Sequence, residues 1–133
     1  MMTYIRHSEH DFTLFVSKGD TTIDEWLDTL AQYSTEGISR LELYDLREHT
    51  NLFSNDEIEM ILAHAVKNTN IRPKDNRTAL LVKGEAQYGL SRMYEGIAMV
   101  EGLQNNDTMA FYNVAEAVEW LGEPAKDALN DYV

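Results

Sequence analysis

The segment at residues 45–54, which leaves the carboxyl end of residues 39–46, carries the side chains best suited to chemistry in this sequence. Residues 39–46 alternate in polarity with a period of two, which predicts a strand. Ser54, with Glu57 three residues later, predicts the start of a helix. In open α/β sheets, binding sites commonly form where a strand ends and a helix begins. The candidates for contact with a ligand or a partner are Asp45, Arg47, His49, Asn51, Phe53 and Ser54.

The same residues also have a purely structural interpretation. Short polar side chains such as Asp45 and Asn51 can fix a loop by hydrogen bonding to its backbone. Serine is among the residues preferred at a helix N-cap, so Ser54 would only cap the helix. Both interpretations stay open at the level of the sequence.

A predicted helix over residues 85–102 contributes two further candidates, Tyr88 and Arg92. They lie away from the apolar stripe of this helix, at a spacing that allows them to touch. Arg92 is the only basic residue between Lys83 and Lys126. Its guanidinium would therefore bind an anion if this part of the chain binds one.

The apolar stripe of this helix is typical of a helix that packs on a sheet. It consists of Ala86, Leu90, Met93, Ile97 and Val100. Gly89 lies inside the same helix, where glycine costs about 1 kcal/mol relative to alanine. We therefore expect the sheet or a ligand to approach closely at Gly89 and to offset that cost.

Several kinds of catalytic and cofactor site have no basis in this sequence. The chain has no cysteine, which excludes thiol catalysis and cysteine-ligated metal. It has neither a glycine-rich phosphate loop nor a Gly-x-Ser-x-Gly nucleophile elbow. Its four histidines show no metal-ligand spacing. We expect no metal, no cofactor and no enzymatic activity, since a catalytic site would need Asp45, His49 and Arg92 to converge.

The charge balance is strongly acidic, with 11 Lys+Arg against 23 Asp+Glu and a net charge of −12. A surface of this sign repels phosphate, so we expect neither nucleic acid nor an anionic membrane surface as a partner. The acidity favours solubility and would also suit a basic protein partner. No apolar run approaches the roughly 20 residues of a membrane span. The first residues do not resemble a signal peptide, so we expect a cytoplasmic protein.

Periodicity along the chain predicts one domain over residues 1–133, with elements in the order β-β-α-β-α-β-α-β-α. The predicted strands cover residues 3–8, 12–18, 39–46, 77–83 and 108–112. The predicted helices cover residues 23–34, 55–67, 85–102 and 114–121, and residues 123–133 form a C-terminal helical tail. A tight turn at His10-Asp11 would make the first two strands a hairpin. The alternation that follows predicts an α/β fold with a mixed, mostly parallel sheet flanked by helices.

Three segments of the chain resemble the SpoIIAA-like proteins, which are small, mostly bacterial relatives of the STAS domain of anti-sigma-factor antagonists. They are the strand at residues 78–83, Tyr-Gly-Leu-Ser-Arg-Met-Tyr-Glu at residues 88–95, and Glu-Ala-Val-Glu-Trp-Leu within residues 115–122. By element order the resemblance covers about residues 3–122, and its motifs are mainly packing signatures. It implies a mixed sheet flanked by helices, with no cofactor and no enzymatic activity.

The resemblance also points to a serine that is phosphorylated in the antagonists, within Asp-Ser-Ser-Gly at the junction after the third strand. The nearest match here is Ser54, where Phe53 replaces the preceding aspartate and no glycine follows. Asp56 and Glu57 would repel an incoming phosphate. We therefore expect a module without the usual serine phospho-switch.

Two functions fit these observations. The first is a non-enzymatic regulatory or protein-interaction module, which predicts an exposed apolar patch such as Leu52-Phe53. The second is a binding module for a small, largely apolar ligand between the sheet and helix 85–102. That pocket needs aromatic residues to converge on a cavity, namely Tyr44, Phe53, Tyr88 and Phe111. The partner is thus an unknown protein or a small apolar ligand, and homodimer formation also stays open.

Overall fold

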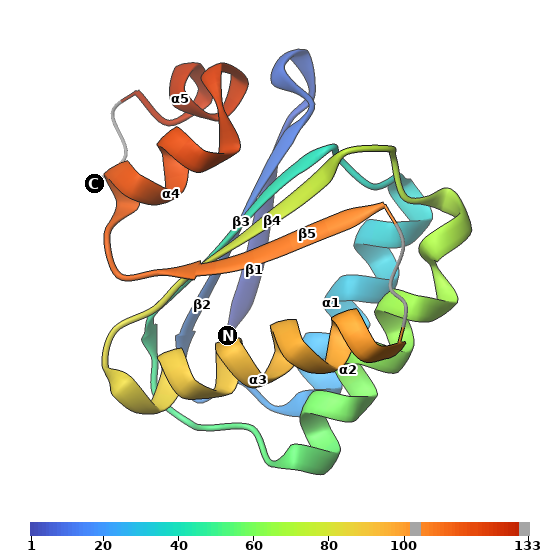
Figure 1. Cartoon of the computed structure of the whole chain (residues 1–133), viewed down its shortest axis with the longest axis vertical. Helices are drawn as coiled ribbons and strands as arrows, with labels where there is room; N and C mark the ends of the chain where they lie inside the picture. The colour runs from blue at the N-terminus through green and yellow to red at the C-terminus, as the bar shows by residue number, and fades with distance from the viewer. Residues whose placement is uncertain (102–104, 131–133) are drawn as a thin grey trace.

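Five strands form a single sheet in the order in which they occur along the chain (Figure 1). The computed structural model describes residues 1–101 and 105–130. The strands are β1 (Met2–His7), β2 (Phe12–Gly19), β3 (Leu41–His49), β4 (Asn76–Leu81) and β5 (Asn106–Phe111). β1 pairs with β2 in antiparallel orientation, and β2 to β5 run parallel to one another. This is the expected mixed, mostly parallel sheet of an α/β fold.

Each parallel connection contains one helix, and two more helices follow the last strand. The helices are α1 (Ile23–Glu36), α2 (Asn55–Lys67), α3 (Glu85–Glu101), α4 (Val114–Leu121) and α5 (Glu123–Ala128). Two short 3-10 helices, η1 (Ser8–His10) and η2 (Thr69–Ile71), complete the order. Among the described residues, none of the helices combines the length and the hydrophobicity that crossing a bilayer demands.

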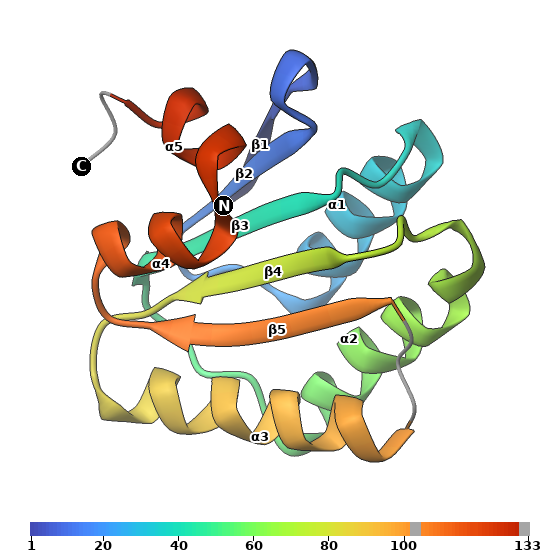
Figure 2. The ribbon, with the colours of Figure 1, turned by 45° about the horizontal axis from the view of Figure 1, so that its top comes forward.

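The consecutive strand order decides where the helices lie. Strand–helix–strand crossovers between parallel strands are right-handed. Because the sheet grows in one direction only, α1, α2 and α3 all fall on the same face (Figure 1). The opposite face would stay bare, and α4 and α5 fold back over it after β5 (Figure 2).

Strand side chains alternate between the two faces, so each face has a core of its own. The core under α4 and α5 is largely aliphatic and consists of Phe12, Leu14, Leu41, Leu43, Ala79, Leu81, Ala117, Leu121, Ala125 and Leu129. The core under α1 to α3 is largely aromatic and consists of Met2, Phe15, Trp26, Leu30, Tyr33 and Tyr44. Phe15 and Tyr44 stack across neighbouring strands with their ring centroids 4.1 Å apart.

A β-bulge near the end of β3 changes the face that His49 occupies. The pairing of β3 with β2 skips one position between Asp45 and Glu48. In a regular strand Asp45 and His49 would share a face. The bulge instead turns His49 toward α1, where its ring lies 6.0 Å from that of Trp26.

The predicted elements occur in the predicted order, but several of their ends differ. β3 continues to His49 instead of ending at residue 46, so Arg47 and His49 belong to the same strand as Asp45 and not to a loop. The expected tight turn at His10-Asp11 is instead the short helix η1, followed by Asp11 in the left-handed conformation. α5 begins directly after residue 122, where the predicted helical tail begins, and ends at residue 128. Residues 131–133 of the predicted tail lie outside the described residues.

α3 turns a different face toward the sheet from the one that its apolar stripe predicted. Ala86 is exposed, whereas Ser91 and Ala98 are buried. A Cβ added to Gly89 would meet nothing within 4 Å, so the expected close approach of the sheet at Gly89 is wrong. The end of the stripe at Val100 and the predicted helix end at Gly102 lie outside the side chains that the structure describes.

Candidate ligand-binding pocket

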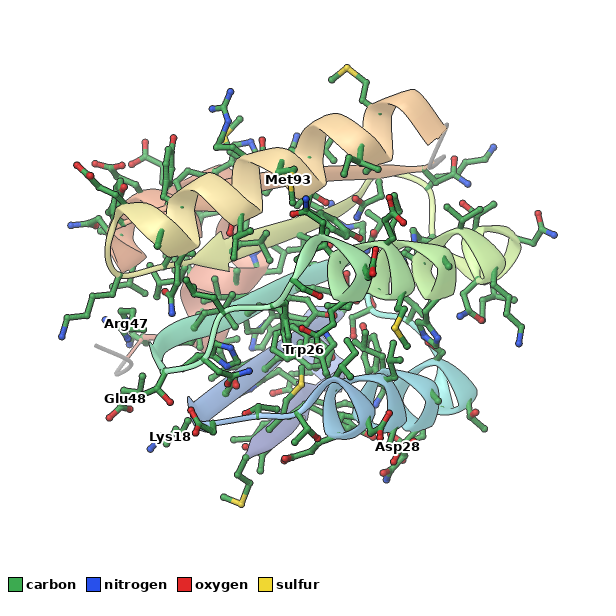
Figure 3. All side chains as sticks on the ribbon, turned by 90° about the horizontal axis from the view of Figure 1, so that it is seen from below. Lys18, Trp26, Asp28, Arg47, Glu48 and Met93 are labelled. Atoms are coloured by element: carbon green, nitrogen blue, oxygen red, sulfur yellow. The ribbon has the colours of Figure 1, made fainter. Side chains whose placement is uncertain are left out.

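A cavity of about 130 Å³ lies between the sheet and helices α1, α2 and α3. Its walls come from β3, β4 and β5 on one side and from all three helices on the other. Figure 3 looks onto this face and shows α2 between α1 and α3, with Trp26 inside the layer between α1 and α2. An apolar cavity of roughly 150 Å³ can hold a benzene molecule. The cavity in this protein therefore has room for about one ring.

Aromatic rings form the wall near the carboxyl end of β3. The Trp26 ring lies edge-on to Phe53 at 5.2 Å and nearly parallel to Tyr44 at 6.0 Å. His49 adds a fourth ring, 5.3 Å from that of Phe53. Aliphatic side chains also line the cavity, namely Leu30, Ile38, Leu46, Ile58, Ile61, Leu80 and Leu90. Apolar and aromatic linings of this kind are usual in small-molecule sites.

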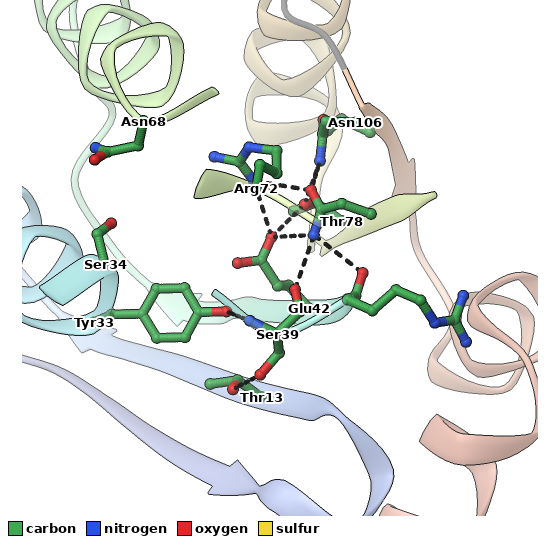
Figure 4. A network of polar contacts seen from close by, with 12 residues as sticks. Thr13, Tyr33, Ser34, Ser39, Glu42, Asn68, Arg72, Thr78 and Asn106 are labelled. Atoms are coloured by element: carbon green, nitrogen blue, oxygen red, sulfur yellow. Dashed lines mark hydrogen bonds and ion pairs between the residues drawn. The ribbon is translucent and has the colours of Figure 1, made fainter. Parts of the chain in front are cut away.

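A buried charged pair forms the polar end of the cavity: Glu42 on β3 and Arg72 before β4 (Figure 4). Their side chains are only 3% and 10% exposed, and Arg72 Nη1 lies 3.5 Å from Glu42 Oε1. The Thr78 hydroxyl donates to the same oxygen at 2.7 Å, and Arg72 Nη1 donates to Asn76 Oδ1 at 2.8 Å. Figure 4 shows the other carboxylate oxygen of Glu42 on the side of Tyr33. Buried charges persist only when they are paired and hydrogen-bonded, and this network meets both conditions.

Two buried donors of the lining have no hydrogen-bond partner among the described residues. They are Arg72 Nε and Trp26 Nε1. Leaving a buried donor unpaired costs roughly 1–3 kcal/mol. A bound molecule with a hydrogen-bond acceptor could recover part of that cost.

Burial keeps the phenol groups of the cavity uncharged. It raises the pKa of Tyr94 to about 12 and the pKa of Tyr44 well above its ordinary value. Burial, and then the neighbouring charge of Glu42, also raise the pKa of Tyr33. The Tyr33 oxygen accepts a hydrogen bond from the backbone N–H of Ser39 at 2.7 Å, which fixes this ring.

The residues that line the cavity are electrically balanced, although the whole chain carries a net charge of −12. Among the described residues of the lining, Glu42 and Arg72 are the only members of the Asp, Glu, Lys and Arg types. His49 and His64 also line the cavity, and burial lowers the pKa of both. Their neutral forms are therefore favoured, and the positive charge of Arg72 is matched by the negative charge of Glu42.

Each of these histidines is held by a neighbouring element. His49 Nδ1 lies 2.8 Å from Ser17 Oγ, which in turn lies 2.8 Å from Thr21 Oγ1. Ser17 is only 1% exposed, so this Ser–His pair orients the ring and offers no accessible nucleophile. His64 on α2 lies 3.3 Å from Ser34 Oγ on α1 and thereby links the two helices.

Half of the residues predicted in the strand-to-helix segment line the cavity. They are His49, Asn51 and Phe53. Asn51 also anchors the segment, because its side chain accepts from Thr21 N at 2.8 Å and donates to Thr21 O at 3.0 Å. The part of the segment that follows the bulge therefore forms one end of the pocket.

Asp45, Arg47 and Ser54 are not part of the lining. Arg47 donates to both carboxylate oxygens of Asp45, at 3.0 and 2.8 Å. Ser54 caps α2 by accepting from Glu57 N at 3.2 Å, and the Glu57 carboxylate accepts from Ser54 N at 2.8 Å. This is the predicted capping box, and it fits the structural interpretation of Ser54.

Tyr88 and Arg92 lie outside the lining as well. The Tyr88 ring stacks on Tyr112 with centroids 4.7 Å apart, and Arg92 is exposed on α3. α3 turns Gln87, Leu90, Ser91 and Tyr94 toward the cavity, and this leaves Tyr88 and Arg92 on its outer sides.

Only two of the four aromatic residues expected to converge on a cavity do so. Tyr44 and Phe53 line it, whereas Tyr88 does not. Phe111 packs against Trp120 in the opposite core, at a centroid distance of 5.6 Å. Strand alternation explains this, because the last residue of β5 points to the face of α4.

The structure does not bring Asp45, His49 and Arg92 together. Asp45 lies on the same face of β3 as Leu41 and Leu43, which pack under α4. His49 lines the cavity on the other face, and Arg92 is exposed on α3. The strand order never reverses among β2 to β5, so the crevice that a switch in order creates does not form. Within residues 1–101 and 105–130, no cluster of three or more His, Cys, Asp or Glu is arranged to hold a metal.

Sequence reasoning missed the polar end of the cavity. Glu42 gave the one usable signal, because the alternation of residues 39–46 places it on the same face as Tyr44 and Leu46. A charged residue among apolar neighbours in an inner strand indicates a buried polar site. Arg72 lies in an irregular segment before Pro73, and no pattern marks it.

Together these features define an α/β protein with a pocket under the helices of one sheet face. No family model matches the chain, and neither a curated protein nor a solved structure matches it. Its function is therefore inferred from the pocket itself.

Proposed function

We propose that this protein binds a small, largely apolar molecule in the cavity between the sheet and helices α1 to α3. The observation that carries the proposal is the cavity of about 130 Å³. Protein interiors are close-packed, and voids larger than a water molecule are few. Apolar space that the protein leaves unfilled forfeits packing contacts, at a cost that rises with its volume. A ligand that fills the space would offset that cost.

The lining suits such a ligand. Somewhat more than half of its residues are aromatic or aliphatic, and polar side chains, among them the Glu42–Arg72 pair, could fix the orientation of a bound molecule. Leu52 belongs to the lining and is 54% exposed, so it joins the cavity to the surface. The segment between β3 and α2 is accordingly the entrance that we propose.

We further propose that the protein is a non-enzymatic binding module of the SpoIIAA-like, STAS-type class, without a serine phospho-switch. The order of elements and the mixed sheet flanked by helices support this assignment. The capping contacts of Ser54 with Glu57 support a structural role for that serine.

A protein-interaction module has less support from the surface. The patch that it predicts is Leu52-Phe53, and Leu52 is indeed exposed. Phe53, however, packs its ring against Trp26 and His49 inside the pocket. Phe53 is therefore half-buried, and Leu52 is the exposed member of the expected pair, which favours the ligand-binding proposal.

The test is the binding of toluene, a probe of one ring, measured as an increase in thermal stability. At ten times its Kd, toluene should stabilise the wild type by about 1.4 kcal/mol. Ala65 on α2 is buried in the lining, so Ala65→Leu should fill the cavity and remove the effect. Ala63→Leu is the matched control, because Ala63 is exposed on the same helix.

The outcomes separate clearly. Stabilisation of the wild type and of A63L, with none in A65L, would support the proposal. A wild type that does not respond at saturating toluene would contradict it. Equal stabilisation of A65L by toluene would show that toluene binds elsewhere, and it would contradict the proposal that the cavity is the binding site.

A further inference from the structure

We infer that the ligand is an uncharged compound with a single aromatic ring and a carbonyl oxygen, and that Arg72 donates a hydrogen bond to that oxygen. This inference rests on the proposed function. It follows from the size of the cavity, the charge of its lining and the kind of polar atom that the lining leaves unpaired.

Size and shape point to one ring. The cavity measures about 130 Å³, and two fused rings or a long chain would need more space. Trp26, Tyr44 and Phe53 present ring faces and edges to it. Aromatic pairs gain attraction from offset-stacked and edge-to-face contacts beyond the area that they bury.

The charge of the lining points to a neutral ligand. Glu42 and Arg72 already neutralise each other in a site where their side chains are at least nine-tenths buried. An anion would lie close to the Glu42 carboxylate, and a cation would lie close to Arg72. Either one would also lose its hydration on entry, which is costly in an apolar site.

The unpaired atoms point to an acceptor. Among the described residues of the lining, the buried polar side-chain atoms without a partner are Arg72 Nε and Trp26 Nε1, and both are donors. A carbonyl oxygen has the lone pairs to accept from them and carries no proton that needs a partner. Hydrogen bonds from a charged donor are stronger than those from a neutral one, which favours Arg72 over Trp26 as the partner.

Four probes of similar size test the inference on the wild-type protein. They are acetophenone (neutral, with a carbonyl), ethylbenzene (neutral, without one), benzoate (anionic) and benzylammonium (cationic). Kd values from titrations followed by the methyl signals of Ala65 and Leu80, which line the cavity and are present in every variant, rank the four. We expect acetophenone to bind about tenfold more tightly than ethylbenzene, which is the ratio that about one net hydrogen bond supplies. Benzoate and benzylammonium should bind more weakly than either neutral probe.

Two variants identify the donor. Arg72→Lys keeps a positive charge beside Glu42 but removes the Nε–H group, so the preference for acetophenone over ethylbenzene should fall to about twofold or less. Trp26→Phe removes the other unpaired donor and keeps a ring, and the preference should persist. If R72K keeps the tenfold preference while W26F loses it, Trp26 is the donor and the assignment to Arg72 is wrong.

The wild-type ranking alone decides the rest, even if a variant fails to fold. Equal binding of acetophenone and ethylbenzene would overturn the carbonyl but would leave the proposed apolar pocket in place. Benzoate or benzylammonium as the tightest probe would overturn the neutral ligand. Failure of all four probes to bind would overturn the proposed function together with this inference.

Discussion

Glu42 and Arg72 are charged side chains in a layer that α/β proteins usually fill with apolar residues. Replacing a buried ion pair by well-packed apolar residues is often neutral or stabilising, so such a pair is weak evidence for stability. Here the pair borders a cavity and leaves one of its donors unsatisfied. This combination is easier to explain by binding than by folding.

Two tyrosines of the cavity lining should respond differently to the loss of the hydroxyl. Tyr33→Phe leaves the buried N–H of Ser39 without its acceptor and should cost about 1–3 kcal/mol of unfolding free energy. Tyr94 has burial as the first cause of its raised pKa and no hydrogen bond among the causes. Tyr94→Phe should therefore change the stability by no more than about 0.5 kcal/mol. Urea unfolding of both variants measures the difference, and equal losses would contradict the account of the polar end.

His49 should make stability depend on pH. Burial is the first cause that lowers its pKa, so the unfolded chain takes up this proton more readily than the folded protein. The contribution of His49 to the free energy of unfolding is therefore fully present above the ordinary histidine pKa of about 6.5, and it is lost as the pH falls below that pKa. His49→Gln should flatten this fall between pH 7.5 and pH 5.5 in urea unfolding.

The control for that experiment is His10→Gln, because His10 lies in η1 and not in the lining. His64 has a pKa that burial lowers in the same way, so H49Q should retain part of the fall and H49Q/H64Q should lose more. Burial raises the pKa of Glu95, so this carboxyl stabilises the folded protein as the pH falls, opposite to the histidines. Glu95 is present in every variant, so its contribution is the same in all of them. A fall of unchanged size in H49Q would show that His49 is not the group responsible.

At the scale of elements, α3 should be stabilised by replacing a glycine whose surroundings have space for a methyl group. Gly89 lies mid-helix, and a Cβ there would meet nothing within 4 Å, so Gly89→Ala should add about 0.5–1 kcal/mol. Gly96→Ala should act alike, for the same reason. Gly84→Ala should instead destabilise, because Gly84 has a φ of +98° that other residues rarely adopt. Thermal unfolding checks all three, and a loss in G89A would mean that this helix is packed more closely there than the structure shows.

The elements were predictable because their signals are local. Alternation in residues 39–46 and the capping boxes at Thr22 and Ser54 depend on residues within a few positions of one another. The sheet follows from them, since alternating strands and helices with right-handed crossovers leave few arrangements. The β-bulge before His49 interrupts the alternation of side chains in β3, and no short-range sequence pattern predicts this bulge.

The site was less predictable because it depends on contacts between residues that are far apart in the sequence. Glu42 and Arg72 are 30 positions apart and meet only when β3 and β4 pair. Trp26 reaches the cavity because α1 crosses over the carboxyl end of β3. Of the predicted residues, His49, Asn51 and Phe53 line the pocket. Tyr88 and Arg92 miss it because α3 is rotated relative to its apolar stripe.

In the whole molecule, the two faces of the sheet differ: one borders the cavity, and the other packs against a solid core. Three crossover helices lie on one face because the strands follow the order of the chain, and this face contains the cavity. The last two helices close the other face over a dense aliphatic core. Among the described parts of the chain, the acidic residues lie mostly at the surface, and the pocket itself is balanced. The molecule therefore presents a repulsive exterior to anions and a neutral interior to an uncharged ligand.

The most direct test of this account locates a bound probe by nuclear Overhauser contacts from its ring protons to methyl groups of the protein. With acetophenone present, we predict contacts to the methyl groups of Ala65 and Leu80, which line the cavity. Ala117 serves as the internal reference, because it is fully buried in the opposite core. Contacts to Ala65 and Leu80 without contacts to Ala117 would place the ligand between the sheet and helices α1 to α3. Contacts to Ala117 alone, or to neither face at saturating probe, would contradict the central claim.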